Sequence, residues 1–194
     1  MSLLALVSAA ALSGPPLTLP PQLADTACQI LLPNDVPVEG RKSPLDSLTF
    51  LVAKQPVKLC YGRPSSRGRV MLGGAAVPYG KLWRTGANEP TTIHTTAPIV
   101  VAGIRIPAGA TSLYTVPGES SWEVVLNSST EQWGDEGSYD KVRATEIGRA
   151  KVTAGHLGTS VEQFTLRQES KGGTTVLILE WETTRISVPV ETGR

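Results

Sequence analysis

The sequence has few side chains that bind metals and no apolar run long enough to cross a membrane. It contains two cysteines, Cys28 and Cys60, and two histidines, His94 and His156, without a CxxC pair. A four-ligand zinc site would need all four residues to converge from distant positions, so we expect no metal and no cofactor. The longest apolar run is far below the ~20 residues of a membrane-spanning helix, and we expect no membrane-spanning segment.

A large excess of charge is also missing. The chain has 18 Lys and Arg residues against 17 Asp and Glu residues, a formal charge of +1. This balance excludes a globally basic nucleic-acid binder, so we expect no nucleic-acid partner. With 194 residues, 40% of them hydrophobic and 18% charged, the chain has the composition of a globular protein with one domain and a tail.

No Lys or Arg precedes Arg41. Residues 1–14 resemble the apolar core of a secretory signal without its usual positive charge. As a helix, about ten residues span only about 15 Å, half the hydrocarbon thickness, so the segment cannot cross a bilayer. We expect a retained anchoring segment; ordinary secretion with cleavage after Ala10 or Ala11 is the alternative. The residues expected to attach to a partner are Leu3, Leu4, Leu6, Val7 and Leu12.

Residues 15–44 hold seven of the 15 prolines. Because proline lacks an N–H donor and fixes φ, we expect this segment to be an extended strap. A disulfide between Cys28 and Cys60 would pin the strap to the domain and stabilise the fold by roughly 3–4 kcal/mol. We predict this disulfide, which requires an oxidising compartment; two buried free thiols are the alternative in a cytosolic protein.

Residues 45–194 are expected to form a β-rich globular domain, because short apolar runs alternate with Gly, Pro and Asn and no long helical period occurs. The pattern predicts an all-β fold, an antiparallel β-sandwich or a jelly-roll-like barrel of about 8–10 short strands. Hairpin turns are expected at Lys54-Gln55-Pro56 and Ala102-Gly103, and His156 is expected in a glycine-flanked turn. The predicted strands are Leu48–Ala53, Val57–Tyr61, Thr92–Thr96, Ile99–Val101, Ile104–Ile106, Ser112–Val116, Glu123–Asn127, Glu162–Gln168, Thr175–Glu182 and Arg185–Val190.

Charge is unevenly distributed along this domain. Residues 54–105 contain eight basic residues and one acid, Glu89, whereas residues 119–140 contain six acids and no base. The two segments either neutralise each other in the fold or form surfaces for oppositely charged partners.

The densest cluster of potential binding side chains lies between Tyr61 and Glu89, where arginines alternate with glycines. Guanidinium groups bind carboxylates and phosphates, and glycines let backbone N–H groups approach an anion. The spacing of Gly74 and Gly80 does not match a Walker A motif. One interpretation is a site for a small anion; the other is that the arginines order the loop by bonding carbonyls and Glu89 or Asp46. The candidate ligand-binding residues are Arg63, Arg67, Arg69, Trp83, Arg84, Asn88 and Glu89.

No catalytic residues are predicted. A serine triad built from Ser65, Ser66 or Ser112 would need His94 or His156 beside it, and nothing in the sequence places them together. A GxSxG elbow is also missing. The four tryptophans would form a sugar-stacking face or, in the alternative, core and interface anchors.

Several motifs carry a resemblance to a known family. They are SPLDS (43–47), YGRPSSRGR (61–69), VPYGKLWRTGANEPT (77–91), IPAGATSLYTVPG (106–118), QWG (132–134) and LEWETTRISVPV (179–190). In this order they resemble the bacterial family of domain of unknown function 2911. The resemblance implies an exported, β-rich envelope protein, and it carries no reaction, cofactor or catalytic residue.

Two classes of function follow from these observations. We favour a non-catalytic structural or interaction subunit in the periplasm, peripheral to the membrane and held on a membrane protein complex by its N-terminal segment. An electron-transfer or photosynthetic complex is one candidate partner. The alternative is an exported small-anion or carbohydrate-binding or hydrolytic domain that uses the arginine-rich loop.

Overall fold

The structure, a computed structural model, describes Cys28 and residues 38–193, so the 1–14 segment and most of the proline-rich strap lie outside the described residues. Strands dominate the described part, with one short helix and one 3-10 turn. In chain order the elements are β1 (Leu45–Val52), β2 (Gln55–Gly62), β3 (Thr91–Thr95), β4 (Ile99–Val101), β5 (Ile104–Ile106), β6 (Gly109–Val116), β7 (Ser121–Asn127), α1 (Glu136–Lys141), η1 (Arg143–Thr145), β8 (Glu146–Lys171) and β9 (Thr174–Thr192).

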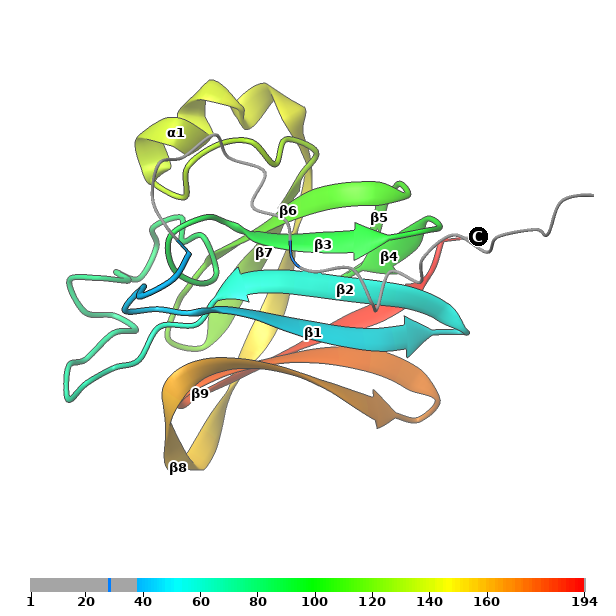
Figure 1. Ribbon diagram of the computed structural model, residues 1–194. Coiled ribbons are helices and arrows are strands. Elements are labelled where there is room, and N and C mark those ends of the chain that lie inside the picture. Colours follow the sequence, from blue (N-terminus) through cyan, green and yellow to red (C-terminus); the bar gives the residue numbers. More distant parts are fainter. Residues whose placement is uncertain (1–27, 29–37, 194) are drawn as a thin grey trace, which may run out of the picture.

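The strands form one antiparallel sheet in the order β1-β2-β3-β6-β7-β8-β9-β4-β5. The long strand β8 bends, so its first half extends the β1–β7 layer while its second half pairs with β9 in a layer that faces the first (Figure 1). The sheet does not close on itself, so the fold is the predicted all-β sandwich rather than a barrel.

The core lies between these two layers. Strand alternation directs Val57, Leu59 and Tyr61 of β2 inward, against Leu177 and Leu179 of β9, and all five are buried. This alternation is the two-residue period that makes one face of a strand apolar. Burial of these faces holds the two layers together.

One of the two predicted hairpin turns is confirmed, and the other lies at a different position in the sequence. Ala102 and Gly103 form the expected two-residue turn, both with positive φ, as a type I′ turn requires. The first turn was placed one residue too late: Ala53 and Lys54 form it, and Pro56 belongs to β2. Proline is tolerated there because pairing of β2 with β3 starts only at the next residue.

The last two strands are much longer than predicted, with 26 residues in β8 and 19 in β9. The two predicted strands 175–182 and 185–190 are one strand, interrupted by an irregularity at Glu182, where φ is +52°. The first half of β8 was missed, and His156 lies in it opposite Thr184 rather than in a turn. Polar and apolar residues alternate from Arg149 to Ala154, but the apolar ones are mainly alanines and glycines flank the stretch, so its sequence resembles a loop, which explains the error.

Helix α1 packs on the outer face of the β6–β7 pair. Asp135 caps its N-terminus by accepting from the backbone N–H of Ser138 at 2.8 Å. Tyr139 of α1 contacts the ring of Tyr114 at a centroid distance of 4.7 Å. Among the described residues, no helix combines the length and apolar character needed to cross a membrane.

Candidate functional site

The loop between β2 and β3 contains all seven candidate ligand-binding residues, and it is fastened to the opposite layer of the sandwich. The carboxylate of Glu182 on β9 accepts hydrogen bonds from the backbone N–H groups of Met71 and Leu72, at 2.9 and 2.8 Å. Glu162 on β8 accepts from the backbone N–H of Arg67 at 2.7 Å. Two carboxylates therefore hold the backbone of this long loop in place.

Arg63 is part of this structural framework. Its guanidinium donates to the carbonyl of Phe164 at 3.3 Å and to Oγ1 of Thr165 at 3.0 Å, both on β8. It also pairs with Asp46 on β1 at 3.3 Å. The expected ion pair between a loop arginine and Asp46 is therefore present, and it joins the two layers.

Arg67 and Arg69 lie on the exposed side of the loop. Arg67 donates to the carbonyl of Lys42 at 2.8 Å, and Arg69 donates to the carbonyls of Ser66 and Ser65 at 3.1 and 3.4 Å. Since the acceptors are neutral carbonyls, these bonds order the loop without cancelling the two positive charges.

Trp83 is a core residue. It is 6% exposed and stacks on Trp181 with ring centroids 5.7 Å apart, and its indole N–H donates to the carbonyl of Gly86 at 3.0 Å. Trp122 packs edge-on against it and is also buried. The tryptophans thus do not form a sugar-stacking face, because three of the four lie in the core.

Asn88 and Glu89 are likewise engaged within the protein. The side-chain amide of Asn88 donates to the carbonyl of Ser43 at 3.2 Å. Glu89 pairs with Arg41 at 2.7 Å, and both side chains are nearly inaccessible to water. These contacts join the residues before β1 to the end of the loop, so both side chains have a structural role, although Oε1 of Glu89 is buried without a hydrogen-bond partner.

A small cavity of about 150 Å³ opens beside Arg84, between the loop and the segment that precedes α1. Arg84 donates to the carbonyl of Asn88 at 2.9 Å. Burial lowers the pKa of Arg84 below its ordinary value, although the nearby charge of Asp135 opposes this shift. Lys81 supplies a second cation and Trp83 an apolar wall, so this cavity keeps three members of the cluster together.

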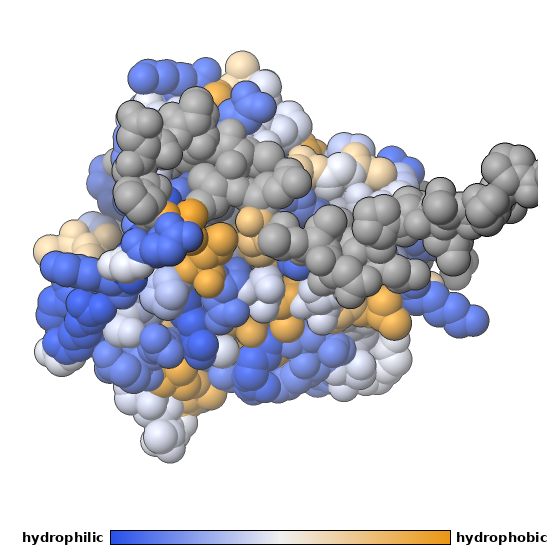
Figure 2. All heavy atoms as spheres, viewed as in Figure 1, coloured by the Kyte–Doolittle hydropathy of each residue, from blue (hydrophilic) through white to orange (hydrophobic). Residues whose placement is uncertain are grey.

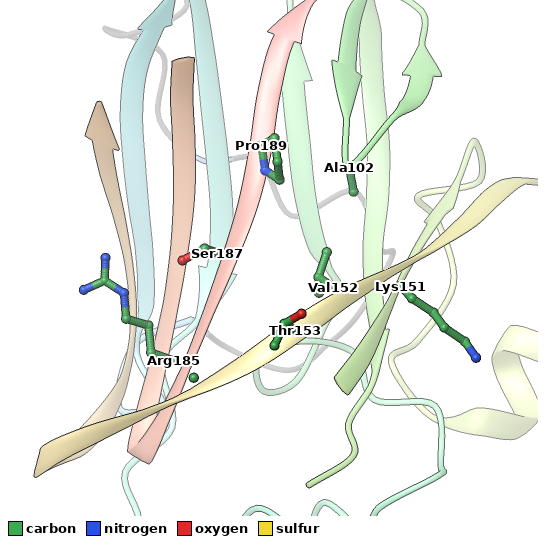
Figure 3. Close-up of a pocket in the computed structure, with 8 residues that line it drawn as sticks. Ala102, Lys151, Val152, Thr153, Arg185, Ser187 and Pro189 are labelled. Carbon is green, nitrogen blue, oxygen red and sulfur yellow. The ribbon is translucent and has the colours of Figure 1, made fainter. Parts of the chain in front are cut away.

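A larger groove, of about 540 Å³, lies where β8 and β9 separate. The strands pair at Gly155 and Arg185 and then diverge, because β9 pairs with β4 from Val190 onward. Figure 3 shows Thr153 and Ser187 on the facing strands, with Lys151 and Arg185 extending away on opposite sides. The residues that line the groove are Ala102, Lys151, Val152, Thr153, Gly155, Arg185, Ser187 and Pro189.

This groove was not predicted from the sequence. Its walls come from strands about 30 residues apart that alternate polar and apolar side chains, as solvated sheet faces generally do. Its hydroxyl groups have no histidine or carboxylate beside them among the lining residues, so the groove lacks the partners that activate a nucleophile.

The family model described as "Protein of unknown function (DUF2911)" matches residues 43–190. This chain belongs to that family. The match confirms the resemblance carried by the sequence motifs, and the DUF2911 region contains the entire β2–β3 loop, the Arg84 cavity and the groove. Neither a curated protein nor a solved structure matches the chain.

Cys28 and Cys60 are joined by a disulfide, with Cα atoms 5.7 Å apart. The bond attaches a residue that precedes the DUF2911 region to the second strand within it. Cys60 lies on the face of β2 opposite the sandwich core, because Leu59 and Tyr61 on either side point inward. Residue 28 is therefore held on the outer face of the first layer. Leu3, Leu4, Leu6, Val7 and Leu12 lie outside the described residues.

The histidines and serines of the DUF2911 region do not assemble into a triad in the hydrogen bonds of the described residues. His94 contacts Thr92 Oγ1 at 2.9 Å, and burial followed by the charge of Lys58 lowers the pKa of His94. Ser112 Oγ donates to the carbonyl of Ser129 at 2.6 Å. Within residues 38–193 and Cys28, no group of three or more His, Cys, Asp or Glu side chains is placed to hold a metal ion.

The acidic segment 119–140 does not form ion pairs with the basic loop among the described side chains. Glu123 pairs with Arg149 of β8 at 3.5 Å, and Asp140 pairs with Arg143 in the next turn. The two charged segments meet only beside Arg84 among the contacts described, where Gly134 packs on its side chain and Asp135 lines the same cavity without an ion pair.

Proposed function

We propose that this protein is an exported, non-catalytic interaction subunit that attaches to the periplasmic face of a membrane protein complex. An electron-transfer or photosynthetic complex is one candidate partner. The observation that carries the proposal is the disulfide between Cys28 and Cys60, which attaches a residue near the middle of the strap to β2. A disulfide of this kind persists in oxidising compartments such as the periplasm.

The state of the β2–β3 loop supports the non-catalytic part of the proposal. Four candidate ligand-binding residues, Arg63, Trp83, Asn88 and Glu89, make structural contacts with strands, core or neighbouring backbone. A loop whose polar groups bond its own fold is rigid, and rigidity favours the docking of one surface on another.

In this proposal the attachment is made by Leu3, Leu4, Leu6, Val7 and Leu12. Burial of these side chains against a protein groove would stabilise the complex by several kcal/mol at about 25 cal/mol per Å². The disulfide fixes Cys28 on the folded domain, so the chain that connects the attachment to the domain starts at one defined point. This restricts the positions that the domain can take relative to the partner.

The test is gentle solubilisation of native membranes followed by isolation of the protein. We expect it to co-purify with an integral membrane assembly and to have an intact mass that includes residues 1–14. Deletion of residues 1–14 should release it, whereas the exposed substitution Lys171→Gln, a matched control, should not. A mature chain that begins after the apolar run, or a deletion variant that stays associated, would overturn the proposal.

The cavity beside Arg84 supports a second candidate function, small-anion binding by an exported domain. Two cations, Arg84 and Lys81, line it together with one carboxylate, that of Asp135, and a volume of about 150 Å³ admits an ion of the size of phosphate or a carboxylate. Phosphate should raise Tm for the natural protein but not for Lys81→Gln and Arg84→Lys variants. An equal rise in all three proteins would contradict a site in this cavity.

A further inference from the structure

We infer that the tip of the β2–β3 loop, residues 67–70 and 78–81, binds the surface of an anionic lipid membrane. This inference goes beyond the proposed function, because the contact is with lipid rather than with a protein complex. The two contacts involve different parts of the chain and can be tested separately.

The loop tip carries uncompensated positive charge. No Asp or Glu occurs between Arg63 and Asn88. Arg67, Arg69 and Lys81 are exposed, and the guanidinium groups of the two arginines donate to backbone carbonyls. One carboxylate lies at this tip, that of Glu162, which accepts from the backbone N–H of Arg67, and the carboxylate of Glu182 accepts from the backbone N–H groups of Met71 and Leu72. No ion pair neutralises these three cations among the described side chains.

The loop tip also exposes apolar side chains between these charges. Val70 is 72% exposed and Tyr79 is 41% exposed. Only two other large hydrophobic side chains among the described residues are exposed, Val38 and Leu51. A valine and a tyrosine surrounded by basic residues match the composition of surfaces that lie in the membrane interface, where apolar groups enter the headgroup layer and cations meet lipid phosphates.

Two adjacent glycines allow the ring of Tyr79 and the backbone of Val70 to pack against the same part of the loop. A Cβ atom at Gly73 would lie 2.6 Å from the ring of Tyr79, and one at Gly74 would lie 2.1 Å from the carbonyl oxygen of Val70. The backbone N–H of Gly73 donates to the carbonyl of Val77 at 2.9 Å, which closes this part of the loop. The ring of Tyr79 and the backbone of Val70 are therefore held in one ordered part of the loop, which limits the conformational entropy lost on binding.

The position of the loop leaves it accessible. It projects from the end of the sheet opposite the β1–β2 turn (Figure 1). In the view of Figure 2, this end of the molecule is mostly hydrophilic, with one small area of weakly hydrophobic residues in pale orange. A projecting tip can reach a flat surface without interference from the rest of the domain.

Co-sedimentation of the full chain with vesicles tests the inference. Vesicles of phosphatidylglycerol and phosphatidylcholine in equal parts are compared with vesicles of phosphatidylcholine alone. Every variant retains residues 1–14, so any contribution of this segment to binding is the same in all of them. Lys81→Gln should weaken binding to the anionic vesicles about five-fold, the effect of one basic residue near an anionic surface. The matched control is Lys54→Gln, at the opposite end of β2, which should bind like the natural protein.

A second pair of variants tests the contribution of the exposed apolar side chains of the loop tip. Val70→Ser should reduce binding to the anionic vesicles several-fold, whereas Leu51→Ser, an exposed residue on β1, should not. Because all four side chains are exposed, Tm should be nearly unchanged in each variant, which separates lost binding from lost folding. Binding of the natural protein to the anionic vesicles should also decrease as salt is raised.

Equal binding by the Lys81→Gln and Lys54→Gln variants would overturn the inference. So would natural protein that does not distinguish anionic from neutral vesicles. If the natural protein did not distinguish the two kinds of vesicle, but Lys81→Gln released it from a membrane protein complex, the loop tip would bind an acidic protein surface and not a lipid surface. If the variant without residues 1–14 stayed associated with the membrane assembly, the proposed function would be overturned, but the vesicle-binding result would not be affected.

Discussion

Oε2 of Glu182 on β9 accepts a 2.8 Å hydrogen bond from the backbone N–H of Leu72, which is 110 residues earlier in the sequence. The same carboxylate accepts from Met71, and Glu182 has a φ of +52° in the middle of the strand. The irregularity in β9 therefore turns this side chain toward the loop. Glu182 is thus one of the two carboxylates of the other layer that order the loop, and it holds the stretch at Met71 and Leu72.

We predict that Glu182→Gln destabilises the protein by about 2 kcal/mol, because an amide supplies only one oxygen for two N–H donors. Hydrogen exchange should accelerate at Met71 and Leu72 in the variant. Glu191→Gln, an exposed substitution on the same strand, is the control and should change neither quantity. Unchanged exchange in Glu182→Gln would show that the loop is ordered by other contacts.

Removal of the disulfide should cost about 3–4 kcal/mol in the free energy of unfolding. The variant for this test is Cys28→Ala with Cys60→Ala, measured by urea denaturation of the oxidised natural protein and the variant. Mass analysis without reduction should find no free thiol in protein taken from its native compartment. Two alkylatable thiols in that sample would contradict both the bond and the exported location.

Gly134→Ala should destabilise the protein by about 1–3 kcal/mol. The added Cβ would lie 2.5 Å from Cδ of Arg84 and 2.6 Å from the carbonyl oxygen of Asn88, which is a backbone atom that cannot easily move. The matched control is Gly158→Ala, because nothing lies within 4 Å of its added Cβ. Equal melting temperatures for the two variants would contradict the packing of Arg84 on Gly134.

The stability of the protein should depend on pH through His94. Burial lowers the pKa of His94 in the folded state, so the unfolded chain binds more protons between the folded value and the ordinary value of about 6.5. Stability should therefore fall as pH decreases below about 6.5, by less than about 1 kcal/mol because the ring is partly exposed.

His94→Gln should flatten this part of the pH profile of Tm. A profile that stays steep in His94→Gln would show that another group is responsible.

The sequence alone determined the fold class, most of the strand positions and the family. Period-two alternation along β2 and glycine at the β4–β5 turn are local signals, and each predicts its element without knowledge of the rest of the chain. The cysteine pairing was also predictable, because only one pair is available. By contrast, the alternation in the first half of β8 is carried mainly by alanines between glycines, which is a weak local signal, so its strand conformation depends on pairing with β7 and β9.

Only the tertiary structure decided what the arginine-rich loop does. The sequence placed Arg63, Arg69 and Arg84 in one cluster, yet the fold separates them, since Arg63 turns to the strands, Arg69 to solvent and Arg84 to a cavity. The residues that contact these arginines, such as Thr165 and Gly134, are distant from them in the sequence. Nothing in the sequence near each arginine indicates which residue it will contact. Side-chain chemistry can be assigned from the sequence, but the acceptor that each guanidinium finds depends on which strands the fold brings beside it.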